Sequence, residues 1–486
     1  MRKSLLPIDV TGFRIHMVGI KGTGMAALAE ILSAGNASLT GSDVSDEFYT
    51  DAVLAALGIT VLPFSADNIR PDIRLVIYSA AYQRALHPEL KAADALGIPV
   101  LTYTEALGEL SRRFESSGIA GVHGKTTTAA LAGTLLRGAG SSATILAGSA
   151  VSGFGDRSTL VLGNRFFVAE TCEYKRHFLS FCPSRIVLTS VESDHQDYYP
   201  DYASIRDAFV EYARSLPSSG QLFYCADDAG ASEVASRVKA ERPDLRLIPY
   251  GWSAEGPWRL LSYEVQSERA VFRIAAFDAT FALRIPGRHI ALDAVAALAL
   301  TDSLVREEFG GGLEGERLGA VREALEGFAG SRRRCEIVGN VGGVLFMDDY
   351  GHHPTAIRLT LEGIKGFYPN RRLIVDFMSH TYSRTKALID DYARSFSSAD
   401  EVFLHKIYPS AREVPNGSVT GRTLYEKVRR FHPAVRYFEE PMDAFDTLRS
   451  ELREGDLFLT LGAGDNFRLG RRLYDAFRDE KKGARE

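Results

Sequence analysis

The sequence predicts an α/β protein of about three domains, and three observations lead to this fold class. The chain has 486 residues, which is too many for one hydrophobic core and suggests about three domains. Short apolar runs alternate with amphipathic runs of helical length, which is typical of parallel sheets covered by helices. Two glycine-rich turns each follow an apolar run and open a helical run, so we expect these turns to bind phosphate groups.

The composition is that of a globular protein, with 45% hydrophobic and 24% charged residues. A net charge of -5 argues against a nucleic acid or a membrane surface as partner. No apolar run reaches the ~20 residues of a transmembrane helix, and Asp9 interrupts the apolar start that a cleaved signal peptide would need. The four cysteines form no C-x-x-C pair, which indicates neither a disulfide framework nor a thiolate zinc site and favours the cytoplasm.

The first glycine turn follows a predicted strand at 14–18 and precedes a predicted helix at 25–34. A second strand, 38–40, ends just before Asp43, about twenty positions after the first glycine of the turn. In dinucleotide-binding folds such a turn binds a pyrophosphate and such an acid binds a ribose hydroxyl. The spacing departs from G-x-G-x-x-G, so the sequence assigns no nicotinamide or flavin, and a purely structural turn is the alternative.

Further predicted strands at 59–62, 75–79 and 98–101, with a helix at 88–96, complete a doubly wound parallel sheet. Ser79 ends one of these strands, at the edge of the sheet where ligands bind. The polar stretch 112–118 predicts the end of this domain, with a hinge at Ser116–Gly118.

The second glycine turn is Gly121-Val-His-Gly-Lys-Thr-Thr-Thr128, between a strand at 119–120 and a helix at 129–137. Gly121 and Gly124 allow the backbone to approach an anion. In such turns the lysine, here Lys125, contacts the β- and γ-phosphates, and the following hydroxyl, Thr126, binds Mg²⁺. The pattern therefore predicts a nucleoside triphosphate site. Because it is shorter than a full P-loop, an ordinary glycine turn before a helix is the alternative.

Two more strands, 166–169 and 185–189, deliver Glu170 and the segment 191–197. Glu170 and His195 offer the oxygen and nitrogen ligands that a phosphate-bound cation needs, whereas a capping acid and an ordinary loop histidine are the alternatives. Asp194 and Asp197 are equally possible ligands on spacing. His289 precedes an alanine-rich helix at 291–300 and either packs near the nucleotide or only begins the helix. Residues 268–274 and 280–285 alternate like a hairpin.

The last segment predicts a second parallel sheet from strands at 344–347, 372–377, 401–405 and 456–461. The first strand leads to Asp348-Asp-Tyr-Gly-His-His-Pro354, whose proline suits the first turn of a helix. After the second strand, Arg384 is placed to bind a carboxylate or phosphate through two bonds, with His380 and Tyr350 in the same pocket. The charged end, 478–486, is expected to fray.

Together, these motifs resemble the ordered signatures of the Mur ligases, which extend the peptide of bacterial cell-wall precursors. The resemblance runs from the first strand to Gly462-Ala-Gly-Asp465, essentially the whole chain. It implies a Rossmann-like UDP-binding domain at 1–113, a central ATP-binding P-loop domain with a mixed sheet at 114–328, and a Rossmann-like amino-acid-binding domain at 329–486. Hinges near Ser116 and Ala329 would let the domains close.

The motifs 348–354 and 380–385 are similar to those of the family member that adds the first amino acid. The resemblance therefore implies ATP-dependent amide formation between the lactyl carboxylate of UDP-N-acetylmuramate and L-alanine, through an acyl phosphate and with Mg²⁺. A monomer or weak homodimer is expected. The alternatives are the related ligase that attaches a preformed peptide to the same sugar nucleotide and a non-catalytic nucleotide-binding sensor with the same fold.

The resemblance also implies roles for individual residues. Catalysis is expected from Lys125, Glu170, His195, His352, His380 and Arg384, and the metal ligands from Thr126, Glu170 and His195. The expected ATP contacts are Gly121, His123, Gly124, Lys125, Thr126, Thr127, His289, Arg333 and Asp349. The expected UDP-sugar contacts are Gly19, Lys21, Gly22, Thr23, Gly24, Asp43 and Ser79, and the amino-acid contacts are Tyr350, His380 and Arg384.

Two positions depart from the family pattern. Ile290 stands where an asparagine usually follows the histidine, which removes a polar contact expected near the nucleotide base. The usual Phe-Gln-Pro-His is here Phe377-Met-Ser-His380, which retains the histidine. The first departure prompts the sensor alternative. Against that alternative stand Lys125, Glu170, His195 and Arg384, since a decayed site would not be expected to keep all four.

Overall fold

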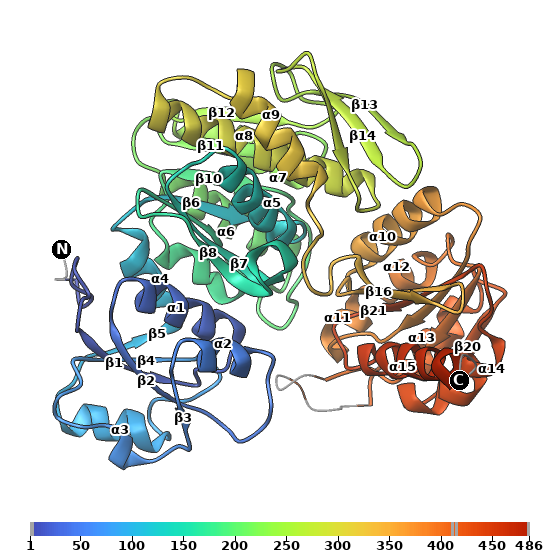
Figure 1. Cartoon of the computed structure of the whole chain (residues 1–486), viewed down its shortest axis with the longest axis horizontal. Helices are drawn as coiled ribbons and strands as arrows, with labels where there is room; N and C mark the ends of the chain where they lie inside the picture. The colour runs from blue at the N-terminus through green and yellow to red at the C-terminus, as the bar shows by residue number, and fades with distance from the viewer. Residues whose placement is uncertain (1–3, 410–412, 414–416, 484–486) are drawn as a thin grey trace. The chain divides into compact units, whose positions relative to one another are not determined.

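The computed structural model describes residues 4–409, 413 and 417–483. The chain has the predicted α/β fold (Figure 1). Within the described residues its strands form sheets of five, seven, three and six strands. Its residues group into two compact units. The first unit runs to Glu192 and adds Ile205–Arg259 and Asp293–Leu325, and the second comprises Ser193–Ser204, Leu260–Leu292 and the chain from Glu326.

The N-terminal sheet is parallel, with strand order β3-β2-β1-β4-β5. Its central strand is a short apolar run that is buried on both faces, as parallel strands between helices usually are. The predicted strand 14–18 is confirmed residue for residue. The elements are β1 Arg14–Val18, α1 Thr23–Ala34, β2 Ser38–Ser42, α2 Thr50–Ala56, β3 Val61–Leu62, β4 Leu75–Tyr78, α3 Pro88–Ala95, β5 Val100–Thr102 and α4 Tyr103–Ser111.

The central sheet has the order β12-β11-β10-β6-β9-β7-β8 and is mixed, because β8 runs antiparallel to β7. Its elements are β6 Glu115–Ala120, α5 Lys125–Gly138, β7 Ala143–Val151, β8 Arg157–Val161, β9 Phe166–Glu170, β10 Arg185–Leu188, α6 Tyr202–Arg214, β11 Gln221–Cys225, α7 Ala229–Glu241, β12 Arg246–Tyr250, α8 Arg288–Phe309 and α9 Gly315–Glu326. A single-turn 3₁₀ segment, η2 Ser152–Phe154, lies between β7 and β8, and a longer 3₁₀ segment, η3 Tyr174–Ser180, lies between β9 and β10.

The predicted hinge at Ser116–Gly118 is wrong. These residues belong to β6, which pairs with β9 on one side and β10 on the other. Ser116 and Ser117 are buried, and Gly118 allows the Tyr212 ring to pack closely against the strand. Ser116, Ser117 and Gly118 resemble a linker in the sequence because they are small and polar or lack a side chain. In the structure their small size allows close packing of β6 against its neighbours.

The second unit contains a three-stranded antiparallel sheet and the C-terminal sheet. The predicted hairpin is confirmed as β14 and β15, with β13 added. The C-terminal sheet has the order β16-β17-β21-β18-β19-β20, with β16 antiparallel to β17. The elements are β13 Leu260–Val265, β14 Ala270–Ile274, β15 Thr280–Leu283, β16 Glu336–Val341, β17 Val344–Asp349, α10 Pro354–Phe367, β18 Arg372–Phe377, α11 Tyr382–Ala387, α12 Ile389–Arg394, β19 Glu401–Leu404, α13 Gly421–Val428, β20 Val435–Tyr437, α14 Phe445–Glu451, β21 Asp456–Leu461 and α15 Phe467–Gly483.

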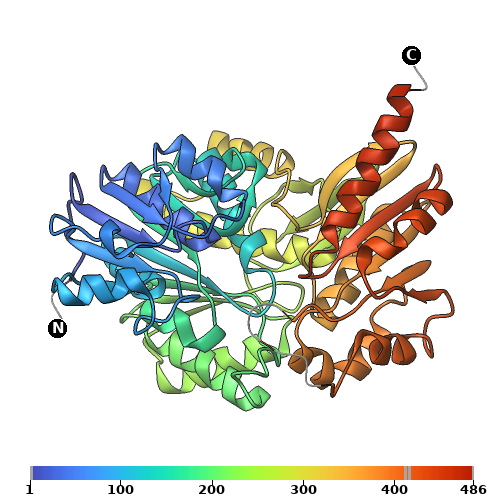
Figure 2. The same ribbon diagram turned by 90° about the horizontal axis from the view of Figure 1, so that it is seen from below.

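The last helix corrects another expectation. The charged end was expected to fray from residue 478, but α15 continues to Gly483, while 484–486 lie outside the described residues. Figure 2 shows α15 beside the C-terminal sheet, where buried Leu469 and Leu473 join its core. No helix among the described residues is both long and apolar enough to cross a membrane.

A buried ion pair lies in the C-terminal sheet. His405, directly after β19, places Nε2 2.7 Å from Oδ2 of Asp376 in β18, and both side chains are fully buried. Burial alone would lower the pKa of His405, but the Asp376 carboxylate outweighs it and raises the pKa above its ordinary value. Asn466 donates Nδ2 to the other carboxylate oxygen, at 2.9 Å, so the pair is embedded in a polar network.

This pair predicts a stability that depends on pH. An unfolded histidine has a pKa of about 6.5, and the folded value is higher, so the contribution is complete below about 6.5 and is lost as pH rises through the folded pKa. Urea unfolding of the wild type and of His405→Gln between pH 6 and 9 measures this. We expect the difference in unfolding free energy to shrink as pH rises, and a difference that stays constant would contradict the assignment.

Candidate active site

The second glycine turn is built by close approach of its backbone to neighbouring strands. Gly121 follows β6 with φ +138°, and Gly124 precedes α5 with φ +79°, conformations that favour glycine. A Cβ on Gly121 would clash with Thr189 Oγ1. The amide of His123 donates to Ser190 Oγ at 2.9 Å, which ties the turn to the end of β10. The helix that follows the turn, α5, begins at Lys125, directly after Gly124, which is four residues earlier than the sequence predicted.

Thr126 and Glu170 form the oxygen pair that the sequence predicted as metal ligands. The Thr126 hydroxyl donates to Glu170 Oε2 at 2.7 Å, which joins the first turn of α5 to the end of β9. Gly148 in β7 lies against both side chains. A Cβ there would clash with Glu170 Oε2 and would lie 2.8 Å from Thr126 Oγ1. The glycine thus keeps space beside two hard oxygen donors, which suits a cation such as Mg²⁺.

Lys125 has a carboxylate partner that the sequence analysis missed. Its Nζ lies 3.0 Å from Oε2 of Glu173, and it also donates to the carbonyl oxygen of Gly121. Burial by itself would lower the pKa of Lys125, but Glu173 and Glu170 outweigh it and raise the pKa. The lysine is therefore a firmly charged ammonium at the glycine turn. Glu173 lies three residues after Glu170, close to the end of β9. This position in the sequence was the signal that could have identified Glu173 as a residue of the site.

The remaining predicted nucleotide contacts in the first unit also lie at this turn. His123 Nε2 is 3.1 Å from Glu192 Oε2, and Thr127 is buried in the first turn of α5. Asp293, on α8, was not singled out from the sequence. Its carboxylate occupies the space that a Cβ on Gly124 would need, so a second acid lies beside the turn.

The first glycine turn is held by its own acid. Asp43 Oδ2 accepts from the backbone amide of Lys21 at 2.7 Å, and Oδ1 accepts from the Tyr82 hydroxyl at 3.2 Å. The Lys21 ammonium lies 3.1 Å from Asp51. A Cβ on Gly19 would lie 2.6 Å from the Tyr82 ring. These contacts shape the turn; the sugar-nucleotide roles of Gly19, Lys21, Gly22, Thr23, Gly24, Asp43 and Ser79 stay predictions.

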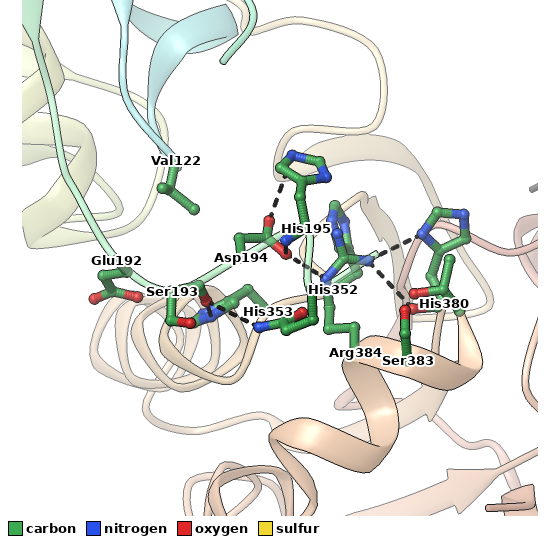
Figure 3. Close-up of polar contacts among 12 residues, drawn as sticks. Val122, Glu192, Ser193, Asp194, His195, His352, His353, His380, Ser383 and Arg384 are labelled. Atoms are coloured by element: carbon green, nitrogen blue, oxygen red, sulfur yellow. Dashed lines mark hydrogen bonds and ion pairs between the residues drawn. The ribbon is translucent and has the colours of Figure 1, made fainter. Parts of the chain in front are cut away.

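The second unit contains a separate polar cluster around Arg384 (Figure 3). Arg384, in α11, is 3% exposed, and its Nε donates to Asp194 Oδ1 at 2.7 Å. Its Nη1 lies 3.1 Å from His380 Nδ1 and donates to the His380 carbonyl oxygen at 3.2 Å. Although burial would raise the pKa of Asp194, Arg384 and His195 hold it well below its usual value. Asp194 is thus a charged partner of Arg384.

Two histidines complete this cluster. The rings of His352 and His380 have centroids 5.6 Å apart. Burial, with the positive charge of Arg384, holds the pKa of His352 well below its ordinary value, so His352 is neutral at pH 7. Its Nδ1 lies 2.9 Å from the Tyr350 carbonyl oxygen, which assigns the ring proton to Nδ1 and the lone pair to Nε2. His195 has φ +55° and lies 3.8 Å from Asp194 through Nε2.

Arg333 and Asp349, expected to bind ATP, make internal contacts in the second unit. Arg333 pairs with Asp348 at 2.9 Å and donates to the Gly462 carbonyl oxygen at 2.7 Å. Its guanidinium also lies over the Tyr350 ring, 5.1 Å from the centroid. Asp349 accepts from the amides of Cys335 and Gly351 at 2.7 and 2.6 Å. Their polar atoms brace the strand-to-helix turn, and a direct role in ATP binding stays a prediction.

His289 and Ile290 lie in the first turn of α8, which begins at Arg288. The His289 ring lies against Gly287, where a Cβ would clash with it. Ile290 is 5% exposed, so the position that departs from the family pattern is a packed apolar residue. The predicted nucleotide role of His289 is untested.

The structure brings the predicted residues together in two groups. Lys125, Thr126 and Glu170 share the first unit, whereas His195, Tyr350, His352, His380 and Arg384 share the second. The third metal ligand, His195, therefore stays a prediction. Asp194 was considered only as a metal ligand, and its pairing with Arg384 could not be read from residues 190 positions apart.

Removing Arg384 should destabilise the second unit. Arg384→Met leaves the buried Asp194 carboxylate without its ion-pair partner, which typically costs about 3–5 kcal/mol. The double variant with Asp194→Asn removes the stranded charge and should recover much of this loss. Urea unfolding measures the effect, with Arg358→Met, an exposed residue of α10, as the control within about 0.5 kcal/mol. A double variant no more stable than Arg384→Met would overturn this account.

Models of all three Mur ligase domains match the chain. The model of the Mur ligase family catalytic domain matches residues 14–115, the middle-domain model matches 119–301, and the glutamate ligase domain model matches 333–464.

Curated relatives match over nearly the full length. The chain is 52% identical over 481 residues to the UDP-N-acetylmuramate--L-alanine ligase of Treponema pallidum, covering 99% of this chain and 100% of that protein. It is 36% identical over 459 residues to the protein of the same name from Borreliella burgdorferi, covering 94% and 97%.

Among solved structures, a UDP-N-acetylmuramate-alanine ligase from Thermotoga maritima aligns with a TM-score of 0.76 at 25% identity, covering 96% of this chain and 99% of that chain. A murein peptide ligase from Psychrobacter arcticus aligns at 0.65 and 22% identity, over 96% and 99% of the two chains, which shows a shared fold.

Proposed function

Because the chain belongs to the Mur ligase family, we propose that it is the ATP-dependent ligase that joins L-alanine to the lactyl carboxylate of UDP-N-acetylmuramate in peptidoglycan precursor synthesis. The full-length relatives at 52% identity carry that name. The observation that carries the proposal is the glycine turn that places Lys125 beside the Thr126–Glu170 oxygen pair.

ATP is needed because a carboxylate is a poor electrophile in water. The lactyl carboxylate attacks the γ-phosphate, giving an acyl phosphate and ADP, and the neutral amine of alanine then displaces phosphate. Lys125, charged and only slightly exposed, offsets the negative charge that repels the attacking carboxylate. We assign nucleotide contacts to the turn residues Gly121, His123, Gly124, Thr126 and Thr127.

Mg²⁺ fits the Thr126–Glu170 pair, since both donors are hard oxygens and Gly148 leaves space beside them. We propose Thr126, Glu170 and His195 as its ligands. Bound there, the ion would neutralise phosphate charge. The protein residues do the positioning, because β9 carries Glu170 and the first turn of α5 carries Thr126.

The polar cluster around Arg384 would bind the amino acid. Arg384 keeps donors beyond those used by Asp194 and His380, and we propose that it binds the alanine carboxylate with His380 and Tyr350. His352 is neutral, with a lone pair on Nε2, so it suits removal of a proton from the alanine ammonium. The Asp194 carboxylate fixes Arg384 for this role.

The related activity, attachment of a preformed peptide, is the runner-up, since the murein peptide ligase shares this fold. Free alanine and tripeptide offered separately, with ADP release followed, distinguish the two. A sensor without chemistry is the alternative of another class. We further propose a cytoplasmic location, because two of the proposed substrates are nucleotides and the described cysteines are all free. A monomer or weak homodimer stays a prediction.

The function is tested with UDP-N-acetylmuramate, ATP, Mg²⁺ and a panel of alanine, serine and glycine, with products weighed by mass spectrometry. We expect amide formation with L-alanine that depends on both the sugar nucleotide and ATP. Lys125→Ala should lower kcat by about 10²–10³, the typical cost of one electrostatic stabiliser. Amide formation by Lys125→Ala at the native rate, or no product from the wild type, would reject the proposal.

The cation site is tested at Gly148. Gly148→Ala places a methyl group against Glu170 and Thr126, so the Mg²⁺ concentration for half-maximal activity should rise about 10- to 100-fold. Gly319→Ala, in α9 with nothing within 4 Å of the new methyl, is the control and should match the wild type. An unchanged Mg²⁺ requirement in Gly148→Ala would place the ion elsewhere.

A further inference from the structure

The first unit contains a cavity of about 160 Å³ that no step above has used. Part of the lining comes from the start of α1, directly after the first glycine turn, and from α4, through Thr23, Gly24 and Tyr103. The lining also includes Gly148 and Glu170 of the central sheet. The cavity thus lies between the turn expected to hold the UDP diphosphate and the Thr126–Glu170 pair expected at the reacting carboxylate.

Tyr103 lines this cavity and carries a hydroxyl that can donate a hydrogen bond. A Cβ on Gly24 would lie 2.9 Å from this oxygen, so the tip of the ring packs on the glycine turn itself. No hydrogen bond joins the hydroxyl to any residue in the described part of the chain. Burial, and then the nearby charge of Glu170, raises its pKa, so it stays protonated and can donate a hydrogen bond.

The rest of the cavity is largely apolar. Leu107 and Leu146 line it together with the aromatic rings of Phe178 and Phe181, and all four are buried. Phe178 stacks on Tyr212 with ring centroids 4.5 Å apart, and Phe181 lies 5.8 Å from Phe167. These contacts fix the apolar wall, so the cavity combines the Tyr103 hydroxyl with a rigid hydrophobic surface. The lining also includes polar groups from Thr104, Thr171, Cys172 and His177.

This combination selects the ligand group. In UDP-N-acetylmuramate, the sugar ring connects the diphosphate to the lactyl carboxylate and carries a 2-acetamido group, which has one carbonyl acceptor and one methyl. We propose, building on the function above, that the cavity binds this acetamido group, with Tyr103 donating to its carbonyl oxygen and its methyl packed on the apolar wall. Tyr103 then selects for the N-acetylated sugar.

A carboxylate is a poorer occupant of the cavity itself. Glu170 lines it, and Glu173 is nearby at Lys125, so a second anion would be repelled unless a cation lay between. A neutral acetamido group avoids this cost and satisfies the hydroxyl.

The test is a cycle between protein and substrate. Wild type and Tyr103→Phe are compared with UDP-N-acetylmuramate and with its 2-deoxy analogue, in which hydrogen replaces the acetamido group. We expect Tyr103→Phe to lower kcat/KM for the natural substrate about 2- to 10-fold, the usual effect of one neutral hydrogen bond, and to leave the analogue unchanged. Equal losses with both substrates, or no loss with either, would overturn the proposal.

Calorimetric binding of both sugar nucleotides, without ATP or alanine, repeats the cycle independently of catalysis. If no amide forms with any amino acid but the binding cycle shows the same selective loss, the cavity assignment stands and the proposed function fails. If amide forms with L-alanine but Tyr103→Phe weakens binding of both sugar nucleotides equally, the proposed function stands and the cavity assignment fails. Tyr224→Phe, in β11 and outside the cavity, is the matched control and should change neither substrate.

Discussion

The active site depends on close approach between backbone and polar side chains, which glycine alone permits. At Gly121, Gly124 and Gly148 the space of a Cβ is taken by Thr189, Asp293 and Glu170 respectively. A side chain at any of these positions would push apart the turn, the β10 end or the oxygen pair. The geometry of the site therefore depends on the lack of a side chain at these three glycines as much as on the charged residues around them.

Around this frame the charges are held in place before any substrate arrives. Lys125 is paired with Glu173 and Arg384 with Asp194; the second pair is buried, and the first is buried except for part of the lysine side chain. Such pairs contribute little net stability, because desolvation offsets their attraction. Their effect is to fix the orientation and protonation state of each cation, so that the proposed binding of phosphate by Lys125 and of a carboxylate by Arg384 would require little reorganisation.

The sequence predicted the fold well because parallel strands read as short apolar runs. Strands at 14–18, 372–377 and 456–461 match β1, β18 and β21 at both ends. Helix starts were predicted too late, at 25 and 129, because the glycine turn and the first helical turn overlap in α1 and α5. The false hinge at Ser116–Gly118 arose because local polarity says nothing about the neighbouring strands that bury it.

The site was predicted in its motifs but not in its partners, and the reason is distance along the chain. Thr126 and Glu170 were expected together because Thr126 follows one predicted strand and Glu170 ends another, and the carboxyl ends of parallel strands meet at the edge of a sheet where ligands bind. Asp194 and Asp293 take their roles from tertiary contacts with Arg384 and Gly124 that no local pattern encodes. Asp194 pairs with the charged Arg384, and Asp293 fills the space beside Gly124. The motifs in the sequence therefore locate the site, but the charge and space within it also depend on these two acids, which the motifs do not include.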